Sequence, residues 1–261
     1  MVKYMKELNM YIVGGAVRDN IRNNILKVVP KVKIKDIDIA VESSSYDEMK
    51  DYIISLGFKI YTENPNFGTL KVRVTPSFHN IVCDWFIDFD KNMIPNVYDF
   101  AMCRSDGVYV DGRHPQSTTP TTIENDLARR DFTINAIAYK IDSSDIIDPY
   151  NGINDIKNRV IRCVGNPCDR FEEDGLRVLR AIRFMITLQF DMNGILSHLI
   201  SDSGAEYLEK SNISNERIRE EVYKIFKYNL YDAIIILADF RGVTNYISNS
   251  MVWLKATMEK K

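Results

Sequence analysis

The strongest constraint on the fold is a change in the spacing of hydrophobic residues near position 148. Before it, short apolar runs alternate with turns, which is typical of strands; these runs are YIVGG at 11–15, IDIAVE at 37–42, KVRV at 71–74 and NAIAYKI at 135–141. After the turn cluster DPYNG, apolar residues recur at helical spacing over 172–187, 195–209, 214–227 and 231–239. The sequence therefore predicts an α+β chain, with a mixed sheet and helices over residues 1–147 and an all-α domain over 148–261.

Composition adds only broad limits. The 261 residues are 45% hydrophobic, enough to bury a sizeable core, and the formal net charge is -2. A chain with this charge is not coated in positive charge, so any contact with nucleic acid must be local. No apolar run approaches the roughly 18 residues of a membrane span, and the N-terminus lacks a secretory signal. We therefore expect a cytoplasmic protein without membrane association.

The first candidate site is the turn that follows the YIVGG strand. Gly14 and Gly15 open a helix that carries Arg18. Two glycines allow backbone amides to approach an anion at a helix N-terminus, where the helix dipole favours phosphate. Such a turn also has a purely geometric interpretation, so it predicts a phosphate site only together with a second motif.

The second motif is the pair Asp36 and Asp38 in KDIDIAV. Residues two apart on a strand point to the same face, with Cα atoms roughly 6.5–7 Å apart. Their carboxylates could then converge on divalent ions about 3.5–4 Å from each other. Mg²⁺ suits this donor set, because it prefers carboxylates, phosphates and water. A solvated strand face is the alternative, and the Gly-Gly turn about twenty residues upstream argues against it.

Longer blocks make the pattern specific. RRDFTINAIAY at 129–139, EEDGLRVLRAIRF at 172–184 and SNISNERIREEVYKI at 211–225 follow in order, with DPYNGINDIKNRVIRCVGNP between the first two. Over roughly residues 10–245 the chain resembles the family of class II CCA-adding enzymes and bacterial poly(A) polymerases. The resemblance implies a nucleotidyltransferase head of the polymerase β type followed by a helical neck.

The family resemblance also implies an activity. It is the template-independent addition of C and A nucleotides, from CTP and ATP, to the 3′ end of tRNA by two-metal phosphoryl transfer. Addition of poly(A), of CC alone or of A alone stays open, because the catalytic blocks are shared. A non-catalytic nucleotide- or RNA-binding module and a transferase acting on a protein or small molecule are the alternatives of other classes.

In the 172–184 block, four polar residues recur every three positions and form a slowly turning stripe; they are Asp174, Arg177, Arg180 and Arg183. Leu176, Leu179, Ile182 and Phe184 are expected to pack inward. The resemblance implies that Asp174 and Arg177 read the incoming base by hydrogen bonds, while the two later arginines contact the nucleotide or its phosphates.

The resemblance assigns further roles in the 129–139 block. Arg130 would bind the nucleotide, and Asp131 and Asn135 would shape its pocket. An ion-pair cluster formed by the two arginines and Asp131 is the structural alternative for this block.

A third carboxylate normally completes a metal site of this type. The resemblance of VYDFAMCRSDGVYVDGRHP at 97–115 points to Asp99, with Arg104 nearby. The preceding segment 75–96 is longer than the family pattern and contains Asp84, Asp88 and Asp90 as competitors.

Members of this family usually continue past the neck into domains that grip the tRNA. This sequence ends at Lys261. Two alternatives follow from the resemblance: a minimal form of the enzyme, or a chain whose RNA specificity comes from an oligomer or an extra partner that replaces those domains.

Overall fold

The computed structural model describes residues 7–27, 34, 36–86, 94–107 and 118–250. The described residues divide into two compact units, one ending at Asn158 and the other beginning at Arg159. Among these residues, no helix is long and apolar enough to cross a membrane.

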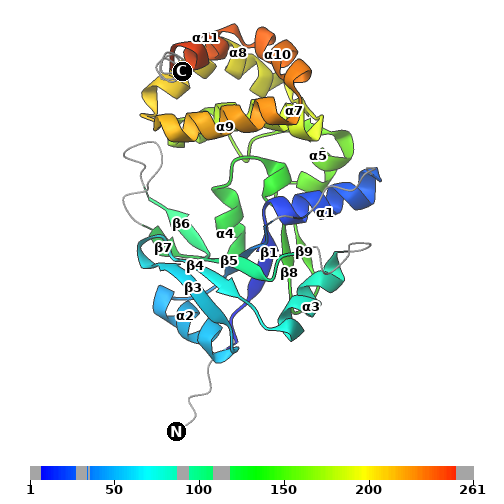
Figure 1. Cartoon of the computed structure of the whole chain (residues 1–261), viewed down its shortest axis with the longest axis vertical. Helices are drawn as coiled ribbons and strands as arrows, with labels where there is room; N and C mark the ends of the chain where they lie inside the picture. Colours follow the sequence, from blue (N-terminus) through cyan, green and yellow to red (C-terminus); the bar gives the residue numbers. More distant parts are fainter. Residues whose placement is uncertain (1–6, 28–33, 35, 87–93, 108–117, 251–261) are drawn as a thin grey trace, which may run out of the picture. The chain divides into compact units, whose positions relative to one another are not determined.

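The first unit is built on a seven-stranded mixed sheet in the order β3-β4-β5-β2-β1-β8-β9 (Figure 1). Its strands are β1 (Met10–Val13), β2 (Asp38–Val41), β3 (Lys59–Asn64), β4 (Thr69–Arg73), β5 (Val97–Met102), β8 (Ala138–Lys140) and β9 (Ile146–Ile147). Only β2 and β5 are parallel neighbours, and every other pair in the sheet is antiparallel. The α+β prediction with a mixed sheet is therefore confirmed.

The central strands alternate between a buried face and a face that carries the polar site. In β5, for example, Tyr98 and Phe100 are completely buried, whereas Asp99 between them is partly exposed. The alternation follows from the two-residue period of a strand. It directs the aromatic side chains into the core and Asp99 to the opposite face.

Helices and turns complete the first unit. They are α1 (Gly15–Leu26), α2 (Tyr46–Ser55), α3 (Pro76–Trp85), α4 (Ile123–Ala128), α5 (Gly152–Asn158), the 3-10 turns Pro65–Phe67 and Thr133–Asn135, and the small sheet of β6 (Arg104–Asp106) and β7 (Thr118–Pro120). The hydroxyl of Ser45 caps α2 by accepting a hydrogen bond from the Glu48 amide. Gly57 follows this helix with a φ of 76°, where glycine is favoured.

The second unit is almost entirely helical. Its helices are α6 (Pro167–Glu173), α7 (Leu176–Leu188), α8 (Gly194–Lys210), α9 (Asn215–Tyr228), α10 (Leu230–Asp239) and α11 (Arg241–Ser250), with short strands β10 (Val160–Ile161) and β11 (Asp191–Met192). In α7, Leu176, Leu179, Ile182 and Phe184 are buried, as predicted. The buried side of α7 packs against α9.

Three element boundaries differ from the sequence prediction. Strand β2 begins at Asp38, so Asp36 precedes the strand. Asn135 ends a 3-10 turn and does not belong to β8. The periodic segment 172–187 is broken, since α6 ends at Glu173 and Asp174 is extended with φ -154° before α7 begins.

Candidate active site

A cavity of about 350 Å³ opens on the polar face of the sheet in the first unit. Its walls come from β1, β2, β4, β5 and α4 together with the turn that follows α4. The lining residues that carry charge are Asp38, Asp99, Asp126, Arg129 and Arg130. The cavity therefore combines carboxylates with guanidinium groups, an arrangement that suits metal ions and phosphates.

Two of the predicted acids meet in this cavity. Asp38 and Asp99 are direct partners across the parallel β2–β5 pair. Asp36 is exposed and lies two residues before Asp38. Asp84 is an exposed residue of α3 and does not line the cavity. The remaining competitors, Asp88 and Asp90, lie outside the described residues.

The carboxyl group of Asp38 has a raised pKa. The surrounding protein, which removes water from one side of the group, is the main cause, and the nearby charges of Asp99 and Asp36 add to it. Arg130 and Lys71 oppose the rise. A cation that binds beside Asp38 would relieve this repulsion.

Among the described residues, no three His, Cys, Asp or Glu side chains gather closely enough to hold a metal ion by themselves. Mg²⁺ is commonly held by one or two carboxylates, with substrate phosphates and water supplying the other ligands. Asp38 and Asp99 match that donor set in type and number. The residues present therefore fit a magnesium site that is completed by substrate.

The Gly-Gly turn lies directly beside these acids. Gly14 has φ 71° and ψ -136°, a conformation open essentially to glycine. A Cβ atom at this position would lie 3.3 Å from Asp38 Oδ2 and 3.5 Å from Arg130 Nη1. Gly14 thus lets the backbone approach both groups, and Gly15 begins α1. The structure brings the predicted phosphate turn and the predicted acids to one place.

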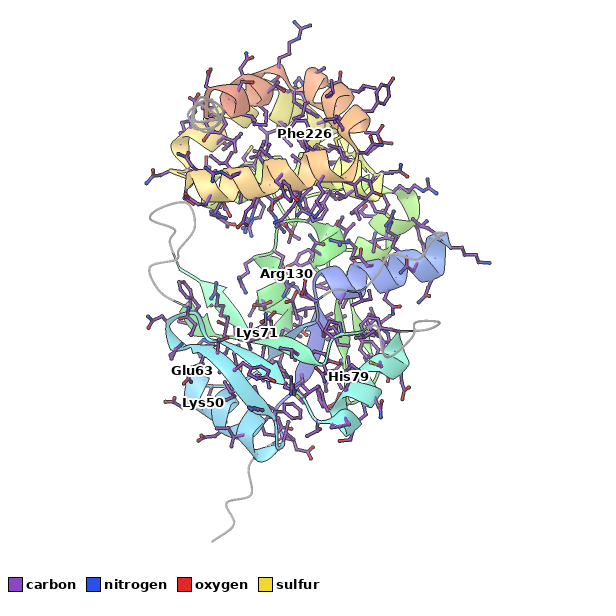
Figure 2. The ribbon with its side chains drawn as sticks, in the orientation of Figure 1. Lys50, Glu63, Lys71, His79, Arg130 and Phe226 are labelled. Carbon is purple, nitrogen blue, oxygen red and sulfur yellow. The ribbon has the colours of Figure 1, made fainter. Side chains whose placement is uncertain are left out.

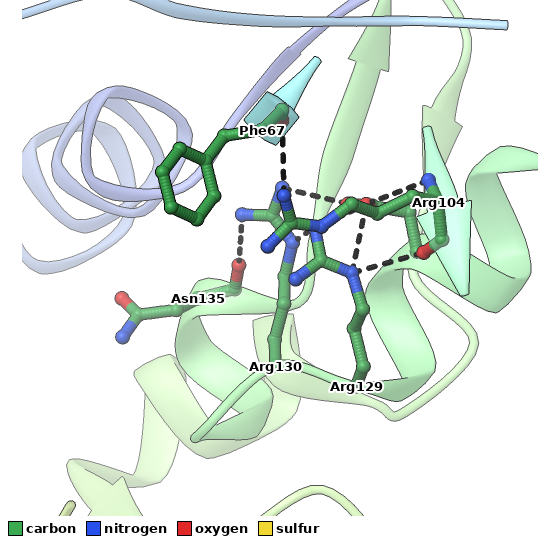
Figure 3. A network of polar contacts seen from close by, with 6 residues as sticks. Phe67, Arg104, Arg129, Arg130 and Asn135 are labelled. Carbon is green, nitrogen blue, oxygen red and sulfur yellow. Dashed lines mark hydrogen bonds and ion pairs between the residues drawn. The ribbon is translucent and has the colours of Figure 1, made fainter. Parts of the chain in front are cut away.

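Asp126 organises the arginines of the cavity. Its side chain is buried, and it binds Arg129 Nη2 at 2.6 Å and Arg130 Nη2 at 3.0 Å. Arg129 Nε also donates to the carbonyl oxygen of Arg104, whose own guanidinium donates to the Phe67 carbonyl at 3.0 Å. Figure 3 shows the guanidinium groups of Arg104, Arg129 and Arg130 gathered together. Arg129 and Arg130 share the Asp126 carboxylate, whereas Arg104 approaches it through its backbone amide at 3.4 Å.

Burial of Asp126 opposes its ionisation, but Arg130 and Arg129 outweigh burial and hold its pKa below the ordinary value. Asp126 therefore stays ionised and keeps both guanidinium groups in place.

A second polar chain connects the remaining predicted residues of this unit. Arg18 Nη1 donates to Asn135 Oδ1 at 2.8 Å, and Asn135 Nδ2 donates to Asp131 Oδ1 at 3.0 Å. Arg130 Nη1 reaches the carbonyl oxygen of Asn135 at 3.4 Å (Figure 3). Asp131 also accepts a hydrogen bond from the Phe132 amide. These contacts bring together the predicted nucleotide-binding residues Arg18, Arg130 and Asn135.

In the second unit, Asp174 and Arg177 lie at the junction of α6 and α7. Asp174 Oδ1 accepts from the Leu176 amide at 3.1 Å, and Arg217 Nη2 of α9 binds its Oδ2 at 2.7 Å. Arg177 forms an ion pair with Glu173 and donates to the Arg170 carbonyl at 3.0 Å. Both side chains are therefore fixed by neighbouring residues of the same unit.

The later arginines of α7 have different surroundings. Arg183 Nε binds the buried Glu221 of α9 at 2.6 Å, and its guanidinium lies 4.3 Å from the centre of the Phe184 ring. Arg180 lies 5.6 Å from the same ring. Burial opposes ionisation of Glu221, but Arg183 and Arg180 hold its pKa below the ordinary value. The contact of Arg183 with Glu221 links α7 to α9.

Sequence reasoning missed four residues of these sites. Asp126 stands three and four residues before the two arginines it holds, a helical spacing that could have been read from ENDLARR. Lys71, which binds Asp99 at 3.3 Å, and Arg217 are brought in by tertiary structure. Glu173 stands four residues before its partner, a spacing also readable from the sequence.

The first unit places paired carboxylates on a mixed sheet beside a glycine turn at a helix N-terminus, and a helical unit follows it. This combination defines a nucleotidyltransferase head with a neck. Residues 10–162 match the model of the poly(A) polymerase head domain. The chain belongs to this family, which includes the CCA-adding enzymes.

Known relatives cover both units. The CCA-adding enzyme of Streptococcus gordonii is 36% identical over 216 residues, which are 82% of this chain and 45% of that protein. The crystal structure of the Bacillus stearothermophilus CCA-adding enzyme with CTP is similar with a TM-score of 0.65 and 30% identity, over 89% of this chain and 48% of that one. A tRNA nucleotidyltransferase complexed with a primer tRNA and an incoming ATP analog has a TM-score of 0.59 and 26% identity, over 90% and 57%. The chain spans about half the length of the curated relatives it matches.

Proposed function

We propose that this chain adds C and A nucleotides, from CTP and ATP, to the 3′ end of tRNA without a template. The observation that carries the proposal is the meeting of Asp38 and Asp99, in direct register, with the Gly14 turn and Arg130 around one cavity. Phosphoryl transfer depends mainly on positioning and on stabilising negative charge, and this cavity contains groups for both.

Asp38 and Asp99 would hold magnesium, with Asp36 at the edge of the site as a further carboxylate. Bound magnesium would lower the pKa of the RNA 3′-hydroxyl and neutralise charge on the triphosphate as pyrophosphate leaves. The raised pKa of Asp38 supports this assignment, since crowded carboxylates gain most from a bound cation.

The triphosphate would lie between the Gly14 turn and the arginines. The amide groups at the start of α1 would bind an anion, as at other helix N-termini. Arg130 and Arg18 would donate to the phosphates or the ribose, with Asp126 and Asn135 holding their orientation. The guanidinium fork suits this task better than a lysine ammonium.

Asp174 and Arg177 would select the base. A carboxylate accepts from the exocyclic amino group that cytosine and adenine share, and arginine donates to a ring nitrogen or carbonyl. A base without that amino group lacks this hydrogen bond to a charged group, at a cost of about 1.5–3 kcal/mol. The contacts to Arg217 and Glu173 would fix the pair before the base arrives.

The relatives support substrate and acceptor. One similar structure contains CTP, and another contains a primer tRNA with an ATP analog. Because this chain spans about half the length of its curated relatives, the choice of tRNA as acceptor is part of the proposal.

The test is incorporation of labelled CTP and ATP into a tRNA that lacks its CCA end, with magnesium present. Wild type is expected to incorporate both, and Asp38→Asn and Asp99→Asn are expected to lose at least 100-fold in rate, an order of magnitude typical of lost electrostatic stabilisation. Asp84→Asn is the matched control, because this acid is exposed on α3 and outside the cavity. Full activity of Asp38→Asn would refute the metal assignment.

A further inference from the structure

The polar face of the sheet continues beyond the active-site cavity onto the two outer strands. A second cavity of about 360 Å³ lies there and shares Thr69 and Asp99 with the first. It is bordered by Lys71, whose Nζ binds Asp99 at 3.3 Å. Figure 2 shows Lys71 on these strands, in the same unit as Arg130. A continuous surface thus leads from the paired acids toward the edge of the sheet.

Next along this face is a group that we call the outer strip, formed by Lys59 and Tyr61 of β3 and Lys71 and Arg73 of β4. Lys71 and Arg73 alternate with the buried Leu70 and Val72, so both point to the polar face. Lys59 is the direct partner of Arg73 across the β3–β4 pair and shares that face.

Tyr61 is an exposed aromatic side chain between cations. Its relative exposure is 42%. The Arg73 guanidinium lies 5.2 Å from the centre of its ring, and Lys59 Nζ lies 5.7 Å away. An exposed ring flanked by cations is the combination that binds single-stranded nucleic acid, because bases stack on the ring while phosphates meet the charges.

The acidic neighbours of the strip have partners already. Glu63 of β3 binds Lys50 Nζ at 2.6 Å and the Tyr46 hydroxyl at 2.9 Å, both on α2. Asp99 is paired with Lys71. Positive charge therefore dominates the strip, although the whole chain has a net charge of -2.

We propose that the outer strip binds the single-stranded 3′ end of the acceptor RNA, with a base stacked on Tyr61 and a phosphate beside Arg73. This inference rests on the proposed function, because it identifies the surface that leads the acceptor end to Asp38 and Asp99. The shared wall of the two cavities and the charge of the strip carry it.

The test measures RNA binding without catalysis. The full chain is titrated into a fluorescently labelled RNA octanucleotide ending in CC, in EDTA, and anisotropy gives the Kd at several salt concentrations. Tyr61→Ala is expected to raise the Kd about fivefold or more through lost stacking, while Tyr61→Phe, which keeps the ring, restores binding. Arg73→Gln is expected to reduce the salt slope by about 0.7, as expected for one lost phosphate contact on a single strand.

Lys140→Gln is the charge control, because Lys140 of β8 is a cation of the same unit that pairs with Asp142, far from β3 and β4 in the strand order of the sheet. The salt slope of this variant should equal that of wild type. A Kd of Tyr61→Ala equal to that of wild type, or no binding of this RNA by wild type, would overturn the proposal. The two proposals fail separately. If wild type adds nucleotides but Tyr61→Ala binds the RNA with the wild-type Kd, only the proposal for the outer strip is refuted. If binding depends on the strip but wild type adds no nucleotide, only the proposed activity is refuted.

Discussion

Replacing Asp126 by Asn tests whether one buried carboxylate holds the arginines of the active site. The side chain is 3% exposed, and its Oδ2 accepts from Arg130 Nη2 at 3.0 Å and from Nε at 3.3 Å. In the variant an amide group replaces one carboxylate oxygen, so a donor faces a guanidinium and the negative charge is lost. Arg129 and Arg130 then lose the carboxylate that they share and repel each other more strongly.

The contacts set the size of the effect. Hydrogen bonds to charged groups contribute about 1.5–3 kcal/mol each, and breaking a fully buried pair costs about 3–5 kcal/mol. The side chains of Arg129 and Arg130 are 27% and 21% exposed, so water recovers part of this energy. We therefore expect a loss of about 2–3 kcal/mol in the free energy of unfolding, or about 4–12 °C in Tm for a chain of this size.

Thermal unfolding followed by circular dichroism measures the loss, and incorporation of labelled CTP measures the accompanying fall in activity. Asp51→Asn removes an exposed acid of α2 in the same unit and should leave both unchanged. If Asp126→Asn melted at the wild-type temperature, the carboxylate would not hold the guanidinium groups as an ion pair, and the argument would be wrong.

Three further predictions follow from single contacts. Gly14→Ala should lower the free energy of unfolding by about 1–3 kcal/mol, because φ 71° with ψ -136° is unfavourable for other residues. It should also lower the rate of nucleotide addition, because the new Cβ would press on Asp38. Thermal melts measure the first effect and incorporation assays the second. Arg183→Met should destabilise the chain by about 2–4 kcal/mol in urea unfolding, because the buried Glu221 loses one of its two ion-pair partners and keeps only the more exposed Lys224. Arg183→Lys should lose less. The free energy of unfolding should also fall in acid, because the pKa values of Asp126 and Glu221 are lower in the folded chain than their ordinary values of 3.8 and 4.5. The stabilisation from these two carboxylates is complete at neutral pH, begins to fade near the ordinary values and is lost as the pH falls through the folded values. Glu221→Gln should flatten this dependence when thermal melts are recorded at a series of pH values.

The architecture could be predicted because hydrophobic spacing encodes it locally. Alternation in β5 and the helical period of α7 place Tyr98, Phe100 and Leu179 in the core, as their fractional exposures confirm. The paired acids were also visible as a two-residue spacing, although β2 begins only at Asp38, so Asp36 is not a strand residue.

Other parts depend on contacts that are distant in sequence. The register that sets Asp38 beside Asp99 joins strands 61 positions apart, and local spacing does not contain it. The break at Asp174 also has a tertiary cause. A Cβ on Gly175 would collide with the carbonyl oxygen of Tyr207 and the hydroxyl of Ser211. Only glycine therefore fits at this position, where the chain packs against the end of α8.

The site could be predicted as a set of residues more readily than as a geometry. The sequence prediction had α7 continue through Asp174 as a single polar stripe, whereas the structure fixes Asp174 in an extended turn through Arg217. The sequence prediction also gave Arg183 a contact with the nucleotide or its phosphates, and the buried Glu221 beside Arg183 could not be foreseen from the period of one helix.

The most direct test of the proposed function is the sequence of the products formed on a tRNA that ends just before CCA, with all four nucleoside triphosphates and magnesium present. We expect addition of C, C and A followed by a stop, no addition to a tRNA that already ends in CCA, and no product with Asp38→Asn. Long A tails on an unrelated RNA would favour a poly(A) polymerase, and absence of any product from the wild-type chain would contradict the account and favour a nucleotide- or RNA-binding module.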